Sequence, residues 1–167
     1  RECQVRITSI ALLHETLHRS NDLSRIKMGD YTRTLTGHLF RSYGVDPGLI
    51  SLELNVDDVE FDIDTGLTCG LIIDELVSNC LKHAFVDNGH GTVHIDLLDH
   101  VDGTFSLCVS DDGIGIPTDG VLNNPDSLGL ELVSLLAEKL DGKTELRSGS
   151  GTEWRIRFQQ LQYSERV

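Results

Sequence analysis

The middle of the chain holds four polar side chains that could act together on a phosphate group. Their spacing of i, i+4, i+7 and i+8 would place them on one stripe of a helix: Glu75, Asn79, Lys82 and His83. A carboxylate, an amide and a cation on one stripe can orient water, ligate Mg²⁺ and contact phosphate. The same spacing is also typical of an ordinary solvated helix face, and for this helix alone that alternative stays open.

A second candidate site lies in the segment VSDDGIGIP, residues 109–117. An apolar strand pattern ends there at Asp111, and Gly113 and Gly115 follow at a spacing of two. A carboxylate at a strand end can accept a hydrogen bond from an exocyclic amine, and glycines let the backbone approach a ligand closely. Taken alone, the pattern is also that of a simple turn.

Two more segments carry glycines at positions where a ligand could bind. SLGLELV, residues 127–133, places Gly129 at the start of an amphipathic helix, where free N–H groups favour a phosphate. GSGTEW, residues 149–154, is a glycine-rich loop that leads through Thr152 into a strand. Each segment has an ordinary alternative, a helix start in one case and a hairpin loop in the other.

The elements that would position these residues follow from apolar periodicity. The helical candidates are residues 7–17, 31–40, 65–85 and 127–140. The strand candidates are residues 50–56, 61–63, 93–97, 105–109, 143–147 and 152–158, with 61–63 expected to pair with 50–56. Helices and strands do not alternate one for one, so we expect an α+β fold in which helices pack on one face of a mixed sheet.

The charge distribution restricts the classes of ligand. The chain has 14 Lys and Arg against 27 Asp and Glu, a net charge of −13. Residues 1–44 carry +3 and residues 45–167 carry −16. A body this acidic disfavours nucleic acid, and a phosphate ligand would need a metal ion and backbone amides.

Two further observations restrict the setting of the protein. No apolar run approaches the length of a membrane span, so we expect no membrane contact by this chain. The four cysteines, at positions 3, 69, 80 and 108, form no C-x-x-C pair, which argues against a zinc or redox site. We expect them to be small buried residues in a reducing, cytoplasmic setting.

The order of the four segments resembles that of the GHKL ATPases, a superfamily that includes DNA gyrase, a class of heat-shock chaperones and histidine kinases. The resemblance covers roughly residues 45–160. It implies a two-layer α/β sandwich of the GHKL (Bergerat) type, preceded here by a short helical segment. ATP and Mg²⁺ would be the ligands.

Within that superfamily the chain resembles sensor histidine kinases. LIIDELVSNCLKHAF looks like their N-box, VSDDGIGIP and SLGLELV like their two glycine boxes, and GTEWRIRF like their final strand. The segment from residue 6 to residue 35 is similar to the latter half of the variant dimerisation domain related to HWE kinases. Since Trp154 is the only tryptophan, the W-x-E signature of strict HWE kinases is absent. The implied division is a partial dimerisation segment, 1–44, and an ATP-binding catalytic domain, 45–167.

The resemblance implies a role for each residue of the polar stripe. Asn79 would be the Mg²⁺ ligand, and Glu75 would orient or polarise groups near it. Lys82 and His83 would contact phosphate or ribose.

The glycine boxes receive their roles in the same way. Asp111 would accept the adenine amine, with Thr152 supporting the adenine site beside it. Gly113 and Gly115 would shape the pocket and its lid.

The second glycine box departs from the pattern of many histidine kinases. Leu128 and Gly129 would lie by the phosphates, but Ser127 stands where those kinases have a further glycine. The implied lid, residues 116–128, is short and acidic, which puts phosphate contacts from the lid in doubt.

The implied reaction is transfer of the γ-phosphoryl group of ATP to a histidine. In this subgroup the acceptor box lies on the first dimerisation helix, upstream of RITSIALLHE. His14-Glu15 mimics such a box but would belong to the second helix. We therefore expect this chain to bind ATP without phosphorylating itself. The parent protein, soluble or membrane-anchored, would act as a homodimer with a response regulator as its partner.

Two other functions remain possible on the sequence. One is a GHKL ATPase or a Ser/Thr kinase of the anti-sigma-factor type, which the helical N-terminal segment disfavours. The other is a non-catalytic nucleotide-binding docking module, which the presence of Glu75, Asn79 and Asp111 disfavours.

Overall fold

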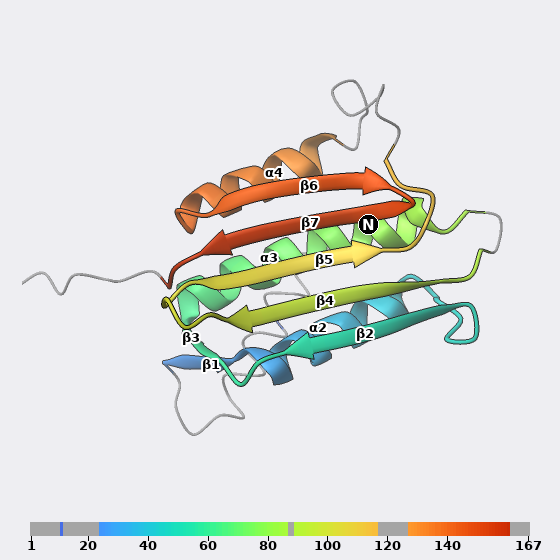
Figure 1. The fold of residues 1–167 in the computed structure, drawn as a ribbon. Helices are drawn as coiled ribbons and strands as arrows, with labels where there is room; N and C mark the ends of the chain where they lie inside the picture. The colour runs from blue at the N-terminus through green and yellow to red at the C-terminus, as the bar shows by residue number, and fades with distance from the viewer. Residues whose placement is uncertain (1–10, 12–23, 87–88, 117–126, 161–167) are drawn as a thin grey trace, which may run out of the picture.

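The computed structural model describes residue 11 and residues 24–86, 89–116 and 127–160. Apart from residue 11, the expected helix 7–17, which includes His14, lies outside the described residues, as does most of the implied lid. In the described part, three α-helices cover one face of a five-stranded sheet (Figure 1). The elements are β1 (Arg25–Lys27), α2 (Met28–Ser42), β2 (Ile50–Val56), β3 (Glu60–Asp62), α3 (Ile63–Asn79), the π-helix η1 (Cys80–Ala84), β4 (Gly91–Asp99), β5 (Phe105–Asp111), α4 (Ser127–Lys139), β6 (Lys143–Gly149) and β7 (Gly151–Phe158).

The large sheet has the strand order β2-β4-β5-β7-β6. β2 runs parallel to β4, and the other neighbouring strands are antiparallel. The parallel pair needs a crossover, which β3 and α3 provide. The expected α+β fold, with a mixed sheet and helices on one face, is confirmed.

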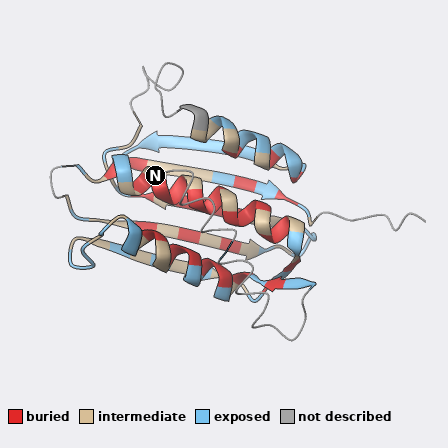
Figure 2. Ribbon diagram, turned by 180° about the vertical axis from the view of Figure 1, so that it is seen from behind, coloured by how far each residue is buried: buried red, intermediate tan, exposed pale blue. Residues whose placement is uncertain are grey.

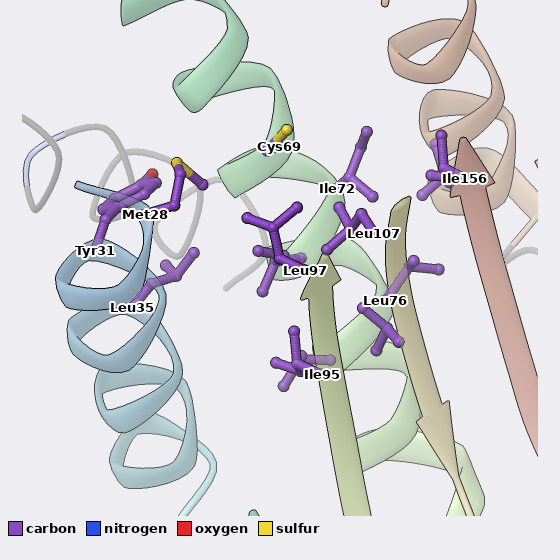
Figure 3. Close-up of a cluster of buried hydrophobic side chains, with 14 of the residues drawn as sticks. Met28, Tyr31, Leu35, Cys69, Ile72, Leu76, Ile95, Leu97, Leu107 and Ile156 are labelled. Atoms are coloured by element: carbon purple, nitrogen blue, oxygen red, sulfur yellow. The ribbon is translucent and has the colours of Figure 1, made fainter. Parts of the chain in front are cut away.

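A single buried cluster joins the helices to the sheet (Figure 3). It contains side chains of α2, α3 and three strands that are at most 2% exposed: Met28, Tyr31, Leu35, Cys69, Ile72, Leu76, Ile95, Leu97, Leu107 and Ile156. On α2, Tyr31, Leu35 and Leu39 recur every four residues and so face α3 together. The three described cysteines, residues 69, 80 and 108, are free and buried, as expected.

The shared core bears on the division expected at residue 44. Tyr31 and Leu35, on one side of it, are fully buried in the same cluster as Ile72, on the other side. Seen from the helix side, α2 turns its buried face towards the rest of the molecule (Figure 2). The helix α2 is therefore part of the packed body, while the boundary between two domains at this place stays a prediction.

The expected pairing of residues 61–63 with residues 50–56 is wrong. Phe61 lies in β3, which pairs with β1 through the register Ile26↔Phe61, and Ile63 already belongs to α3. The aromatic ring of Phe61 packs edge-on against Phe105, with 4.8 Å between ring centroids. Because α3 begins directly after Asp62, only Glu60–Asp62 remain extended, and these three residues pair with β1.

Asp62 determines where α3 begins. Its carboxylate accepts hydrogen bonds from the backbone N–H of Thr65 at 2.9 Å and from the Thr65 hydroxyl at 2.7 Å. Partial burial of Asp62 acts to raise its pKa, but the hydrogen bonds from Thr65 and Gln160 outweigh burial and hold the pKa below its usual value. The ionised carboxylate is therefore the form that stabilises the helix start.

Replacing Asp62 by Ala should lower the free energy of unfolding by about 0.5–2 kcal/mol at pH 7, the usual cost of losing an N-cap. Because the folded pKa lies below the unfolded value of about 3.9, the contribution is full above that value and is lost as the pH falls through the folded pKa. Urea unfolding at pH 7 and at low pH measures both effects.

The exposed Asp99 offers a matched control. Asp99→Ala should change the free energy of unfolding by no more than about 0.5 kcal/mol. Two outcomes would contradict the capping role. One is an equal loss of unfolding free energy in Asp62→Ala and Asp99→Ala at pH 7. The other is a difference in unfolding free energy between these variants that stays as large at low pH.

Candidate functional site

The candidate site is built around the end of β5. Leu107, Val109 and Asp111 are buried at alternate positions of this strand, so Asp111 faces the helices as the apolar residues before it do. Asp111 is 8% exposed as a whole residue, and its carboxylate is held on both oxygens. Oδ1 accepts the backbone N–H of Gly113 at 3.0 Å, and Oδ2 accepts the thiol of Cys80 at 3.3 Å.

The end of the long helix differs from the sequence expectation. Residues 65–85 were expected to form one α-helix, but the α-helix ends at Asn79 and residues 80–84 form a π-helix. A π-helix has wider turns than an α-helix, so the spacing of the polar stripe holds only as far as Asn79. Glu75 and Asn79 are half-buried one turn apart, whereas Lys82 and His83 are exposed on the π-helix.

The π-helix is attached to the first glycine box at both of its ends. At its start, Cys80 donates its thiol hydrogen to Asp111. At its end, the carbonyl of Ala84 accepts the backbone N–H of Ile114 at 3.0 Å. A methyl group on Gly113 would collide with the backbone of Ala84, so only glycine allows this approach without a shift.

Gly115 brings the same loop against the hairpin of β6 and β7. It has a φ of +74°. Beside it, Ile116 donates its backbone N–H to the hydroxyl of Ser148 at 2.9 Å and accepts the hydroxyl proton at 3.1 Å. Ser148 lies in β6, one residue beyond the expected strand 143–147, and the sequence did not predict this contact.

The strands β5 and β7 are neighbours in the sheet (Figure 1), and their register sets Thr152 directly across from Asp111. The sequence placed both residues in one site from the order of the motifs, and the sheet brings them side by side. Gly151, just before Thr152, approaches the carbonyl of Asp111. The final strand therefore forms one wall beside the carboxylate.

The helix α4 lies next to the polar stripe of α3 at Glu75. A methyl group built on Gly129 would lie 2.9 Å from Oε2 of Glu75, so the backbone of α4 passes close to this carboxylate. The side chain of Leu128 lies outside the described residues. The structure thus brings Gly129 beside Glu75 and brings Gly113 and Thr152 beside Asp111, while Gly115 lies against the β6–β7 hairpin.

Cys80 and Asp112 are site residues that the sequence did not single out. Cys80 directly follows Asn79, and burial, followed by the nearby charge of Asp111, raises its pKa well above the usual value. Asp112 accepts the backbone N–H of Thr92 at 2.7 Å and so holds the loop to β4. Cys80 directly follows the expected Asn79, and that position was the only available signal for it. The strand pattern ended at Asp111 and gave no signal for Asp112.

The described residues contain no helix that combines the length and the apolar character needed to cross a membrane. Among these same residues, no three His, Cys, Asp or Glu side chains gather into a possible metal cluster.

Comparison with known proteins identifies the family. A family model described as histidine kinase-, DNA gyrase B- and HSP90-like ATPase matches residues 66–162, which is more than half of the chain. The chain belongs to this family. A second model, described as histidine kinase, matches residues 1–43, where the HWE-related dimerisation region was expected. The GHKL domain is therefore the ATP-binding catalytic domain of a histidine kinase, of the kind used in two-component signal transduction.

Individual relatives agree with the family match. Blue-light-activated histidine kinase 2 of Erythrobacter litoralis (strain HTCC2594) is 32% identical over 106 residues, which are 63% of this chain and 31% of that protein. Sensor histidine kinase PdtaS of Mycobacterium tuberculosis is 31% identical over 147 residues, 85% of this chain and 28% of that protein. The chain thus spans about a third of the length of these relatives.

A solved structure supports the fold independently. The histidine kinase domain of the Erythrobacter litoralis EL346 blue-light activated histidine kinase matches with a TM-score of 0.81 and 25% identity. The match covers 93% of this chain and 78% of that chain. The sandwich expected from the resemblance is therefore the fold of this histidine kinase domain.

Proposed function

We propose that this histidine kinase domain binds Mg²⁺–ATP beside Asp111 and transfers the γ-phosphoryl group to a histidine side chain. The main support is the buried carboxylate of Asp111, held on both oxygens at the end of β5. The carboxylate of a residue that is only 8% exposed suits one specific donor, and the exocyclic amine of adenine is such a donor.

The residues around Asp111 would shape the adenine pocket. Thr152, its cross-strand neighbour, would support the base from β7. Gly113 keeps the loop backbone close to the π-helix, and Gly115 keeps it close to the β6–β7 hairpin. This close packing of the loop would leave room for the ligand beside Asp111.

The donors on α3 fit a magnesium ion. Glu75 and Asn79 offer a carboxylate and an amide oxygen one helical turn apart, and Mg²⁺ takes hard oxygen ligands while keeping several waters. We assign Asn79 as the metal ligand and Glu75 as the group that orients its neighbours. When bound, the ion would neutralise the phosphate charge that builds up during transfer.

The phosphates would extend from the metal site towards α4 and the π-helix. Gly129, beside Glu75, would let the backbone approach them, with Leu128 next to it. Lys82 and His83, exposed on the π-helix, would reach phosphate or ribose. Because phosphoryl transfer depends mainly on positioning and charge neutralisation, these residues would act by holding ATP in place.

The partners of the whole protein are part of this proposal. The histidine kinase match at residues 1–43 favours a histidine acceptor over a Ser/Thr acceptor and over a docking module. We propose a homodimeric, cytoplasmic kinase region that passes its phosphoryl group to a response regulator. The whole protein is incubated with γ-labelled ATP. Protein-bound label that is acid-labile and base-stable would measure the transfer to histidine.

Replacing Asn79 by Ala should weaken Mg²⁺–ATP binding at least tenfold, about 1.4 kcal/mol, because an amide oxygen that ligates the ion is lost. ATP binding in the presence of a chelator should change by less than about twofold. Isothermal titration with and without Mg²⁺ measures both affinities.

Asn55 offers the matched control, since it is exposed on β2 and donates its side-chain amide to Asp96 at 3.0 Å. Asn55→Ala should leave both ATP affinities unchanged. Equal weakening with and without Mg²⁺ in Asn79→Ala would remove the metal role, and an unmodified chain that binds no ATP would overturn the proposed function.

A further inference from the structure

The carboxylate of Asp111 is held by donors from two different segments of the chain. Gly113 belongs to the same loop and donates its backbone N–H to Oδ1 at 3.0 Å. Cys80 comes from the other side of the site, 31 residues earlier, and donates its thiol to Oδ2 at 3.3 Å. One donor on each oxygen fixes the plane of the carboxylate, which otherwise turns easily about its terminal torsion.

The position of Cys80 gives this hydrogen bond a wider effect. Cys80 directly follows Asn79 in the chain and is itself 8% exposed. It is the first residue of the π-helix, whose last residue, Ala84, accepts the N–H of Ile114. The π-helix that directly follows Asn79 is therefore tied to the loop of Asp111 through the Cys80 side chain at its start and through the Ala84 backbone at its end.

We propose that Cys80 is a positioning residue that orients the Asp111 carboxylate towards the adenine base. The proposal rests on the proposed function, in which Asp111 accepts the adenine amine. A carboxylate has about four lone-pair sites, so the bonds from Cys80 and Gly113 leave acceptor capacity for the amine. The Cys80 thiol orients the Asp111 carboxylate before ATP binds. This lowers the loss of side-chain conformational entropy on binding.

The test compares two substitutions that differ in the hydrogen-bond donor. Cys80→Ala removes the donor, and Cys80→Ser keeps one. We expect Cys80→Ala to weaken ATP binding about three- to tenfold and to lower the preference for ATP over GTP by a similar factor. Cys80→Ser should stay within about twofold of the original protein in both measures. Isothermal titration of ATP and GTP on the full chain gives these values, and urea unfolding checks that each variant is folded.

A double-mutant cycle with Asp111→Asn separates positioning from packing. If Cys80 acts through the carboxylate, Cys80→Ala should add little to the loss that Asp111→Asn causes alone. Cys108 is the matched control. It is a buried cysteine like Cys80, but it lies on the strand β5 and not in the π-helix. Cys108→Ala should leave the preference for ATP over GTP unchanged.

Several outcomes would overturn the inference. Cys80→Ser binding ATP worse than Cys80→Ala would indicate an apolar packing position, because packing favours the variant without a buried hydroxyl. Additive losses in the cycle, or an unchanged base preference in Cys80→Ala, would also overturn it. If Asp111→Asn abolishes the preference and Cys80→Ala does not, only the inference fails. If the original protein shows no preference for ATP, the proposed adenine site fails as well.

Discussion

Replacing Gly151 by Ala is expected to lower the free energy of unfolding by about 2–6 kcal/mol and to weaken ATP binding with it. Gly151 has a φ of +105°, a backbone conformation that residues other than glycine rarely adopt. A methyl group there would also collide with the carbonyl oxygen of Asp111. Backbone strain and the collision each contribute about 1–3 kcal/mol. Urea unfolding and ATP titration measure the two losses.

Gly149 is the matched control for this substitution because it lies in the same hairpin. A methyl group on Gly149 has no neighbour within 4 Å, and its φ is not positive. Gly149→Ala should change the free energy of unfolding by no more than about 0.5 kcal/mol. If the two alanine variants are equally stable, then the close approach of β7 to the end of β5 is not as described.

Replacing Leu35 by Ala should lower the free energy of unfolding by about 2–5 kcal/mol, the range for a buried leucine that leaves a cavity. Leu35 lies on α2, is fully buried and belongs to the core that α3 and the sheet share. Because this core is continuous, we expect a single unfolding transition followed equally by all spectroscopic probes. Circular dichroism and tryptophan fluorescence, compared over one urea series, measure it.

Leu135 is the matched control, since it lies on α4 and is 56% exposed. Leu135→Ala should cost no more than about 0.5 kcal/mol. Two separate transitions in Leu35→Ala, or a cost as small as that of Leu135→Ala, would mean that α2 folds apart from the ATP-binding body.

The sequence predicted the elements whose pattern is long and regular. Val93, Ile95 and Leu97 alternate with polar residues, and all three are buried in β4. The motif order also placed Asp111 and Thr152 in one site, and the strand register sets them side by side. The strand prediction succeeded because alternation over five or more residues leaves few other structures that bury the same side chains, whereas the site itself stays a prediction.

Two features could not be predicted because their causes lie far away in the chain. The π-helix at Cys80–Ala84 has no glycine or proline to mark it, and its contacts to Asp111 and Ile114 form only when the sheet is assembled. The three-residue strand β1 pairs with residues 33 to 37 positions later, and so short a segment has no periodicity of its own. Both depend on long-range contacts that override local preference.

The exposed strand β6 affects how copies of this domain meet in concentrated solution. Among the described strands it forms one edge of the large sheet, and each of its residues is exposed. Lys143, Glu145 and Arg147 alternate along it with both signs of charge. A second copy that added a strand there would have to desolvate these charges, so the edge resists sheet-to-sheet aggregation. The alternating charges therefore disfavour the addition of a further strand at this open edge of the sheet.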